Sequence, residues 1–321
     1  MPNSVEKKTV VITGASSGIG FASVLQMVHA GWRVFATVRK PADAQKLRSE
    51  AGAGVTPVMM DVTDRNSVTA ASGQVASELA QRGLDGLVNV AGIGMVRPVA
   101  CIGAGDLQEI FNINVFGQIA VTQAFLPLLH AARGRIVNIS SVGAHIAVPF
   151  GSLINASKAA FGIFNDSLRL ELRPFGIRVS VIEPGAIRTP AVKKTLGDIE
   201  SVIAGLPPEA AAQYGDMLRG FAAKAYEREM NGSSPEVVAQ AVRHALTAPR
   251  PRIRYRVGKH AALLTTLPRV LPDRLLDALL LRIAGLPPAF GALASNQTTR
   301  IGTKAAFGSA LKAVISGYIA A

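Results

Sequence analysis

The chain has 321 residues, of which 49% are hydrophobic and 17% charged, so a disordered, collagen-like or coiled-coil chain is excluded and one large domain or two small ones are expected. A single cysteine, Cys101, excludes a disulfide framework and a cysteine-based zinc site, and the five histidines form no HExxH motif, so we expect no metal. The net charge is +13, and residues 243–321 hold twelve Lys and Arg against two acidic residues.

Strand-like and helix-like patterns alternate along the first 258 residues. Apolar, β-branched runs predict strands at 9–13, 33–38, 55–62, 84–91, 135–140, 177–182 and 254–258. Helical spacing occupies 18–30, 41–51, 64–82, 106–132 and 153–175, and glycines at 31, 83, 134 and 176 follow four of these segments, where helix C-caps are expected. This alternation predicts an α/β fold, a doubly wound parallel sheet of about seven strands with helices on both faces.

Residues 190–234 depart from the alternation because they are Ala-rich and helical throughout. Ser234-Pro235-Glu236 then starts a further helix, with a capping serine and a proline in the first turn. We expect residues 1–258 to form one domain, residues 187–233 to form a lid on its ligand site, and residues 259–321 to form a basic, Leu-rich extension.

A glycine-rich loop follows the first predicted strand and opens the first predicted helix. In it, Gly14 permits a tight turn, Gly18 allows the backbone to approach a pyrophosphate, and Gly20 allows the helix to pack closely on the strand. A plain tight turn is the alternative, but the strand-before, helix-after context favours dinucleotide binding. The candidate cofactor-binding residues of the loop are Gly14, Ser16, Ser17, Gly18, Ile19 and Gly20.

The glycine spacing GxxxGxG and five later motifs, in the same order, resemble the short-chain dehydrogenase/reductase family. These motifs contain Asp61-Val62, Asn89-Val90-Ala91-Gly92, Asn114, Ser141 with Lys158, and the stretch from Pro184 to Thr189. The strand end ATVRK at 36–40 and the long apolar lid resemble its hydroxysteroid and retinol dehydrogenase branch. The resemblance implies a Rossmann-type fold over residues 9–258 and a nicotinamide dinucleotide cofactor. It assigns cofactor contacts to Asp61, Val62, Asn89, Ala91, Gly92, Lys158, Pro184, Gly185, Ile187 and Thr189.

The end of the second strand indicates which dinucleotide is bound. An NAD enzyme places a carboxylate there for the ribose 2′-hydroxyl, whereas this chain has Val38 followed by Arg39. A guanidinium can form a charge-assisted fork with a 2′-phosphate, so we expect NADP(H) to be preferred over NAD(H). The alternative is that Arg39 and Lys40 are only a solvated basic pair.

The resemblance also implies a catalytic set of Tyr, Ser and Lys, with an Asn that supports a proton relay. Ser141, Lys158 and Asn114 match three of these positions. The tyrosine position, thirteen residues after the serine and four before the lysine, is Ile154, which can neither donate nor accept a proton. The usual general acid is therefore absent.

Several interpretations of Ile154 remain open. The chain is a variant that binds NADP(H) without the usual chemistry, an engineered inactive form, or an enzyme with another proton donor, for which His145, Asn155, Ser157 and bound water are candidates. A non-catalytic NADP(H)-binding protein that acts as a sensor or partner subunit is the alternative to an oxidoreductase.

The remaining expectations concern substrate, assembly and location. The apolar lid suggests a lipophilic alcohol or carbonyl substrate, although its side chains would equally suit a core position.

The predicted helices at 106–132 and 153–175 are the family's usual dimer faces, so we expect a homodimer or homotetramer and no nucleic-acid partner. The chain shows no signal-peptide pattern, and its apolar stretch at 275–286 is too short to span a bilayer. We expect a cytoplasmic protein. For the basic extension, core packing or a subunit contact is favoured, with peripheral membrane contact as the alternative.

Overall fold

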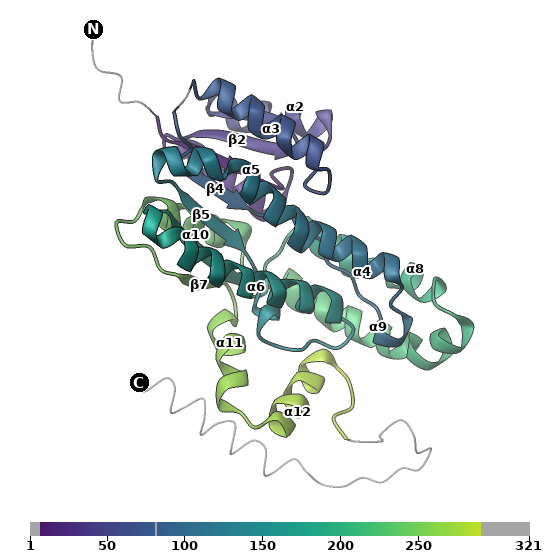
Figure 1. The fold of residues 1–321 in the computed structure, drawn as a ribbon. Helices are drawn as coiled ribbons and strands as arrows, with labels where there is room; N and C mark the ends of the chain where they lie inside the picture. Colours follow the sequence, from purple (N-terminus) through teal and green to yellow (C-terminus); the bar gives the residue numbers. More distant parts are fainter. Residues whose placement is uncertain (1–6, 81, 290–321) are drawn as a thin grey trace. The chain divides into compact units, whose positions relative to one another are not determined.

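The computed structural model describes residues 7–80 and 82–289. Within them, seven strands form one sheet in the order β3-β2-β1-β4-β5-β6-β7, and every neighbouring pair is parallel (Figure 1). The strands are β1 (Thr9–Ile12), β2 (Arg33–Val38), β3 (Val55–Met59), β4 (Gly86–Asn89), β5 (Arg135–Ile139), β6 (Arg178–Pro184) and β7 (Arg254–Val257). This sheet confirms the predicted fold class.

Twelve α-helices lie within the same described residues. They are α1 (Gly18–His29), α2 (Pro41–Ala51), α3 (Arg65–Glu78), α4 (Ala104–Phe111), α5 (Gly117–Ala132), α6 (Ser152–Leu172), α7 (Pro190–Leu196), α8 (Ile199–Ala204), α9 (Pro208–Met230), α10 (Pro235–Thr247), α11 (Ala261–Val270) and α12 (Asp273–Ala284). All of them belong to a compact unit that spans Met1–Leu286, and a second unit, Pro287–Ala321, is described only at 287–289.

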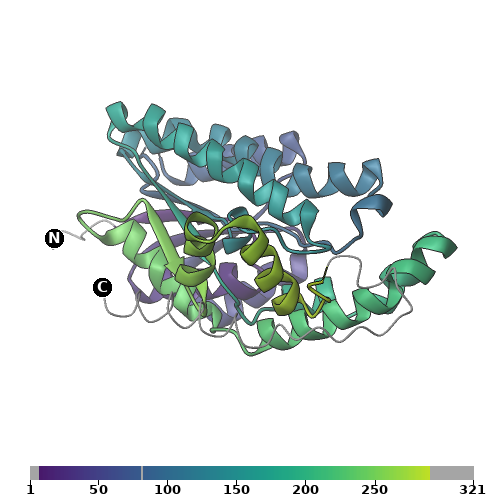
Figure 2. The same cartoon turned by 90° about the horizontal axis from the view of Figure 1, so that it is seen from below.

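Helices lie on both faces of the sheet (Figure 2), and an apolar core fills the space between the sheet and the helices on each face. Along β1, Val10 and Ile12 point to one face and pack with α1, α2 and α10, whereas Val11 points to the other and packs with α3, α5 and α6. Both faces are therefore buried, which explains why the strands are continuous apolar runs without polar alternation.

The predicted boundaries need correction in the helix expected at 106–132. The structure divides it into α4, a π-helical turn at Asn112–Phe116 and α5. The wider turn buries Asn114, and Gly117 makes room for it, because a Cβ at Gly117 would lie 2.8 Å from the carbonyl oxygen of Val62. Several strands also end earlier than predicted, since the last apolar residues of 55–62 and 84–91 line the ligand site and are not in the sheet.

The C-cap expectation holds for two of the four glycines. Gly31 and Gly176 adopt the left-handed conformation, with φ of 83° and 76°. At the end of α5, Arg133 takes that conformation, and Gly134 serves a different purpose. A Cβ there would lie 2.3 Å from the carbonyl oxygen of Leu84, so glycine is required by close packing against the start of the neighbouring strand.

A third apolar cluster connects the helices at one end of the sheet. Ile203 of α8, with Leu218 and Phe221 of α9, packs with Val96 and with Ala284 of α12. The helices predicted for residues 190–234 are thus present, and the extension after residue 258 contributes a helix to their packing.

One helical stretch of the described residues, Ala104–Ala132, is long and apolar enough to cross a membrane by length and composition. Its mean hydropathy reaches 1.3. Within it, Val121, Phe125 and Leu129 are fully buried against the sheet, as in a core helix.

Candidate active site

A cavity of about 730 Å³ opens where the carboxyl ends of β1, β4, β5 and β6 meet. The strand order reverses between β1 and β4, and ligands of open parallel sheets bind at such a reversal. The predicted site residues that line the cavity are Gly14, Ser16, Ser17, Gly18, Ile19, Gly20, Arg39, Asp61, Val62, Ala91, Gly92, Ser141, Ile154, Lys158, Pro184, Gly185, Ile187 and Thr189.

The glycine loop forms a backbone cradle at one end of this cavity. Gly14 has a φ of 61°, and a Cβ on it would lie 2.9 Å from the backbone of Ala91. A Cβ on Gly20 would lie 2.1 Å from the carbonyl oxygen of Gly14, so α1 can begin here only with glycine. The amino end of α1 therefore meets the cavity as bare backbone, and this arrangement fits the pyrophosphate of a dinucleotide.

Two predicted site residues, Asn89 and Asn114, lie outside the cavity lining. The side-chain nitrogen of Asn89 donates to Thr122 and Asn138, at 3.0 and 2.8 Å. Asn114 is fully buried and connects two walls: its Oδ1 accepts from the Ile93 N–H at 2.9 Å, and its Nδ2 donates to the Ile93 carbonyl and the Ser157 hydroxyl. Both asparagines hold the site together from behind.

Arg39 and Asp61 lie at the end of the cavity next to β2 and β3. Asp61 Oδ1 accepts from the Thr63 N–H at 2.9 Å and from its hydroxyl at 2.7 Å. Partial burial acts to raise the pKa of Asp61, but these hydrogen bonds and the charge of Arg39 outweigh it and lower the pKa. Asp61 therefore stays a carboxylate at neutral pH, ready to accept hydrogen bonds.

Ser141, Ile154 and Lys158 line the other part of the cavity. Ser141 lies two residues after β5 and caps a short helical turn, in which its Oγ accepts from the Gly143 N–H at 3.0 Å. Ile154 and Lys158 lie one turn apart on α6, so the residue at the tyrosine position does face the site. The structure thus brings together the predicted serine and lysine, with an isoleucine beside them.

Lys158 is buried, and its Nζ donates to the carbonyl oxygen of Ile139 at 3.0 Å. Burial disfavours the ammonium form and lowers the pKa of Lys158 to about 8. This pKa lies close to neutral pH, so both the amine and the ammonium form are accessible there. Such a shift is unusual for lysine and typical of a functional position.

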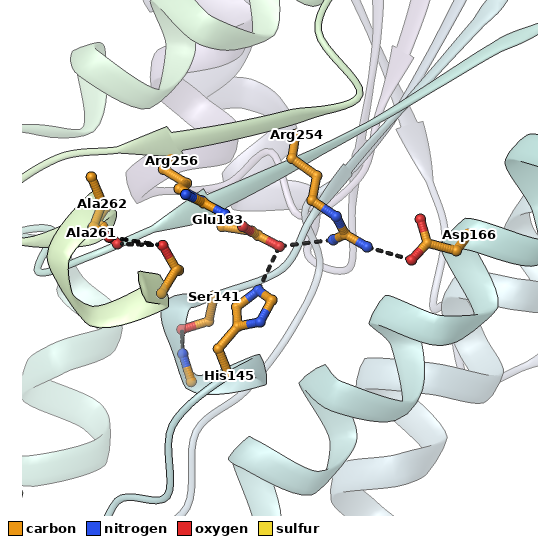
Figure 3. A network of polar contacts seen from close by, with 10 residues as sticks. Ser141, His145, Asp166, Glu183, Arg254, Arg256, Ala261 and Ala262 are labelled. Atoms are coloured by element: carbon orange, nitrogen blue, oxygen red, sulfur yellow. Dashed lines mark hydrogen bonds and ion pairs between the residues drawn. The ribbon is translucent and has the colours of Figure 1, made fainter. Parts of the chain in front are cut away.

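An ionic network around the buried Glu183 anchors the turn after Ser141 (Figure 3). His145 Nε2 lies 2.8 Å from Glu183 Oε1, and the same oxygen accepts from Arg254 at 2.8 Å. Arg254 also pairs with Asp166 of α6, and Arg256 lies 4.0 Å from the second oxygen of Glu183. The network joins the serine turn, β6, β7 and α6, so it fixes Ser141 relative to Lys158.

The structure separates the alternative proton donors. His145 points toward Glu183, as Figure 3 shows, and does not line the cavity. Ser157 is fully buried and donates to the carbonyl oxygen of Ile154. Asn155 does line the cavity, but its side chain donates to the carbonyl oxygen of Ile146 and an amide is not an acid. Bound water is the remaining candidate donor.

Two charged residues of α9, Arg228 and Glu229, line the cavity without having been predicted there. Glu229 Oε2 accepts from the Ile187 N–H at 3.3 Å, and its Oε1 lies 3.6 Å from Arg228 Nε. Burial raises the pKa of Glu229, against the opposing effects of Arg228 and the Ile187 N–H. No sequence motif marks these residues, because only the fold brings the end of α9 to the end of β6.

Comparisons with known proteins show similarity in sequence and in fold. A family model described as short chain dehydrogenase matches residues 8–199. Human retinol dehydrogenase 5 is 40% identical over 280 residues, which cover 84% of this chain and 87% of that protein. A Burkholderia cenocepacia short-chain dehydrogenase in complex with NADP superposes with a TM-score of 0.64 at 25% identity, covering 87% of this chain and 98% of the other. A 3-ketoacyl-(acyl-carrier-protein) reductase from Brucella melitensis, complexed with NADH, gives 0.62 at 25% identity, covering 76% and 93%.

Proposed function

This chain belongs to the short-chain dehydrogenase family, and on that premise we propose that it is an NADP(H)-linked oxidoreductase of lipophilic alcohols or carbonyls. The observation that carries the proposal is that one cavity joins the glycine loop to Ser141 and Lys158. A dinucleotide in the glycine cradle would extend along the cavity toward the part lined by the Ser141 hydroxyl and the buried Lys158 amine.

The cavity residues divide the work between binding and chemistry. The glycine loop holds the pyrophosphate, and the segment from Pro184 to Thr189 holds the nicotinamide end. When bound, the nicotinamide dinucleotide supplies or accepts the hydride. The Ser141 hydroxyl donates a hydrogen bond to the substrate oxygen, and Lys158 places a positive charge beside the cofactor ribose.

The preference for NADP(H) rests on Arg39. Arg39 lines the cavity directly after β2, and the last residue of that strand, where an NAD enzyme places a carboxylate for the ribose 2′-hydroxyl, is Val38. A 2′-phosphate bound there would gain a charge-assisted contact that NAD(H) lacks.

Turnover should be slow because Ile154 stands at the position of the general acid. Carbonyl reduction needs a proton at the oxygen. Ser141 alone polarises that oxygen without supplying an adequate acid, because no hydrogen bond among the described residues joins its hydroxyl to a basic side chain. The alternative function is a non-catalytic NADP(H)-binding protein, and Ile154 is the observation that favours it.

The substrate side of the cavity is apolar. Val96, Ile146, Val148, Leu196, Phe221 and Leu264 line it. A lipophilic substrate would bury its hydrocarbon against these side chains. The name of the human relative points in the same direction, and on that basis we include retinoid alcohols and aldehydes in the proposed substrate class.

A substrate panel tests the proposal. Oxidation of NADPH is followed with retinal, a steroid ketone, a long-chain aldehyde and short polar ketones, beside a binding titration of NADPH. Slow turnover confined to the lipophilic compounds is expected. Binding of NADPH without turnover of any compound would support the non-catalytic alternative, and failure to bind any dinucleotide would refute both.

Assembly and location complete the proposal. Exposed apolar side chains on and before α5 and α6, namely Phe116, Ile163 and Leu170 at 57%, 72% and 58% exposure, support a homodimer or homotetramer through these helices. Exposed Leu263, Val270, Leu275 and Ile283 on α11 and α12 support peripheral contact of a cytoplasmic protein with an anionic membrane.

A further inference from the structure

The contact between Glu229 and Ile187 lies where the proposed nicotinamide end of the cofactor would bind. Ile187 follows β6 and lines the cavity, and its N–H points at Glu229 Oε2 at 3.3 Å. The side chain of Glu229 keeps 25% of its surface exposed, so the carboxylate is at the cavity wall and not behind it. A carboxylate therefore occupies the one backbone donor that Ile187 offers.

We propose that Glu229 is an internal competitor for the nicotinamide subsite: in the empty protein it accepts the Ile187 N–H that the carboxamide of the cofactor takes when it binds. The inference rests on the proposed function, since it needs the nicotinamide to reach Ile187. It goes further by giving a lid residue control over cofactor affinity.

The backbone around the contact is fixed, so the exchange involves a side chain and not the lid. Beyond α9, the Ser233 N–H donates to the Ala186 carbonyl at 2.9 Å, and the Arg188 N–H donates to the Ser233 carbonyl at 2.9 Å. These two bonds bracket Ile187 and tie the end of α9 to the loop after β6. Rotation of the Glu229 side chain is then sufficient to vacate the Ile187 N–H, and Arg228, 3.6 Å away, can retain the carboxylate.

The test compares dinucleotide affinity across three variants. Glu229→Ala removes the competitor, and NADPH should bind about three- to tenfold more tightly, the usual net worth of one hydrogen bond. Glu229→Gln keeps an acceptor oxygen of the same reach, so its affinity should stay near that of the unmodified protein. Glu227→Ala removes a carboxylate from the exposed surface of α9 and should change nothing.

A ligand without nicotinamide separates contact from charge. The ligand 2′-phospho-ADP-ribose contains the adenosine half of NADPH and both pyrophosphate charges, but no carboxamide. It should bind the unmodified protein and Glu229→Ala equally. Equal tightening of both ligands would show that only negative charge was removed, and would overturn the proposal.

Further outcomes also decide it. Weaker NADPH binding in Glu229→Ala would mean that Glu229 holds the cofactor, and unchanged binding would mean that it has no part, so either result overturns the inference. Gln behaving like Ala would do the same. Failure of the proposed function is distinguishable, because the unmodified protein would then bind neither NADPH nor the truncated ligand.

Discussion

Ile154 and Lys158 face the same cavity from successive turns of α6, so an isoleucine occupies the place from which a proton donor would reach both substrate and lysine. We predict that Ile154→Tyr raises kcat by about 10² to 10⁴, the usual contribution of positioned acid–base catalysis. The ammonium of Lys158 would lower the pKa of the new phenol and make it a competent acid. Steady-state reduction of a lipophilic aldehyde with NADPH measures the change.

The matched control is Ile154→Phe, which adds the ring without the hydroxyl. It should leave turnover at the level of the unmodified chain, and both variants should bind NADPH as before. Equal gains in Phe and Tyr would attribute the effect to packing. Fast turnover by the unmodified chain would show that another donor, such as bound water, already serves the site.

Arg39 should determine the choice of dinucleotide. We expect NADPH to bind more tightly than NADH. Arg39→Ala should reduce the ratio of the two affinities by about tenfold, because a charge-assisted hydrogen bond to the 2′-phosphate is lost. Lys40→Ala is the control, since Lys40 is exposed, adjacent in sequence and not part of the cavity lining. Calorimetric titration of both cofactors measures the four affinities. Equal affinities in the unmodified protein would remove Arg39 from the assignment.

The low pKa of Lys158 predicts a pH dependence of binding. In the empty protein the amine loses its proton around pH 8, whereas the negative charge of a bound dinucleotide favours the ammonium. Above pH 8, binding must therefore take up a proton, and the affinity for NADPH should fall with rising pH, by up to about tenfold per unit. Fluorescence titrations from pH 6.5 to 9.5 measure this fall. In Lys158→Met the curve should be flat over the same range, and a slope that survives the substitution would assign it to a different group.

Removal of Arg254 should destabilise the fold because it leaves the buried carboxylate of Glu183 without its main partner. Glu183 is 1% exposed, while His145 and Arg256 still face it, so we expect Arg254→Leu to lower the free energy of unfolding by about 3 kcal/mol, the low end for a broken buried pair. Arg252→Leu, at an exposed position two residues earlier, should cost little. Urea denaturation measures both. If Arg254→Leu costs as much in a Glu183→Gln background, the pair is not the cause.

The exposed apolar residues of α11 and α12 predict binding to anionic vesicles. The full chain should co-sediment with phosphatidylserine-containing vesicles and less so at high salt. Leu263→Asp and Val270→Asp, at 41% and 56% exposed positions, should reduce the bound fraction without changing NADPH affinity. Ile253→Asp, at a 50% exposed position outside these helices, is the control. Sedimentation unaffected by the helix substitutions would exclude this surface.

The sequence predicts the sheet well because its signals are local. Each strand is a short apolar run, the run is buried on both faces, and the glycine loop depends on steric limits that only glycine meets, as the Gly20 contact with Gly14 shows. The ends of parallel strands also explain the position of the site. Because their carboxyl ends lie at one edge of the sheet, one cavity is lined by Arg39, Ser141 and Lys158.

Other parts of the site depend on contacts between distant segments, which local patterns do not encode. The π-helical turn that buries Asn114 looks in sequence like continuous helix, and the direction of His145 depends on Glu183 in another strand. Glu229 reaches Ile187 only because α9 returns to the end of β6. For Glu183 the sequence does contain a signal, because it is the only acidic residue in an otherwise mostly apolar segment. The register of β6 and β7 places Arg256 opposite to it.

The separation of Glu183 from Arg254 along the chain has a consequence for how the protein is made. Arg254 follows Glu183 by 71 positions in the chain, so a ribosome releases β6 well before β7 exists. Until β7 arrives, the outer edge of β6 has no strand beside it, and burial of Glu183 would leave its carboxylate without either of its arginine partners. The sheet therefore cannot be completed until β7 has been synthesised. During that interval the open edge of β6 is available to chaperones and is prone to aggregation.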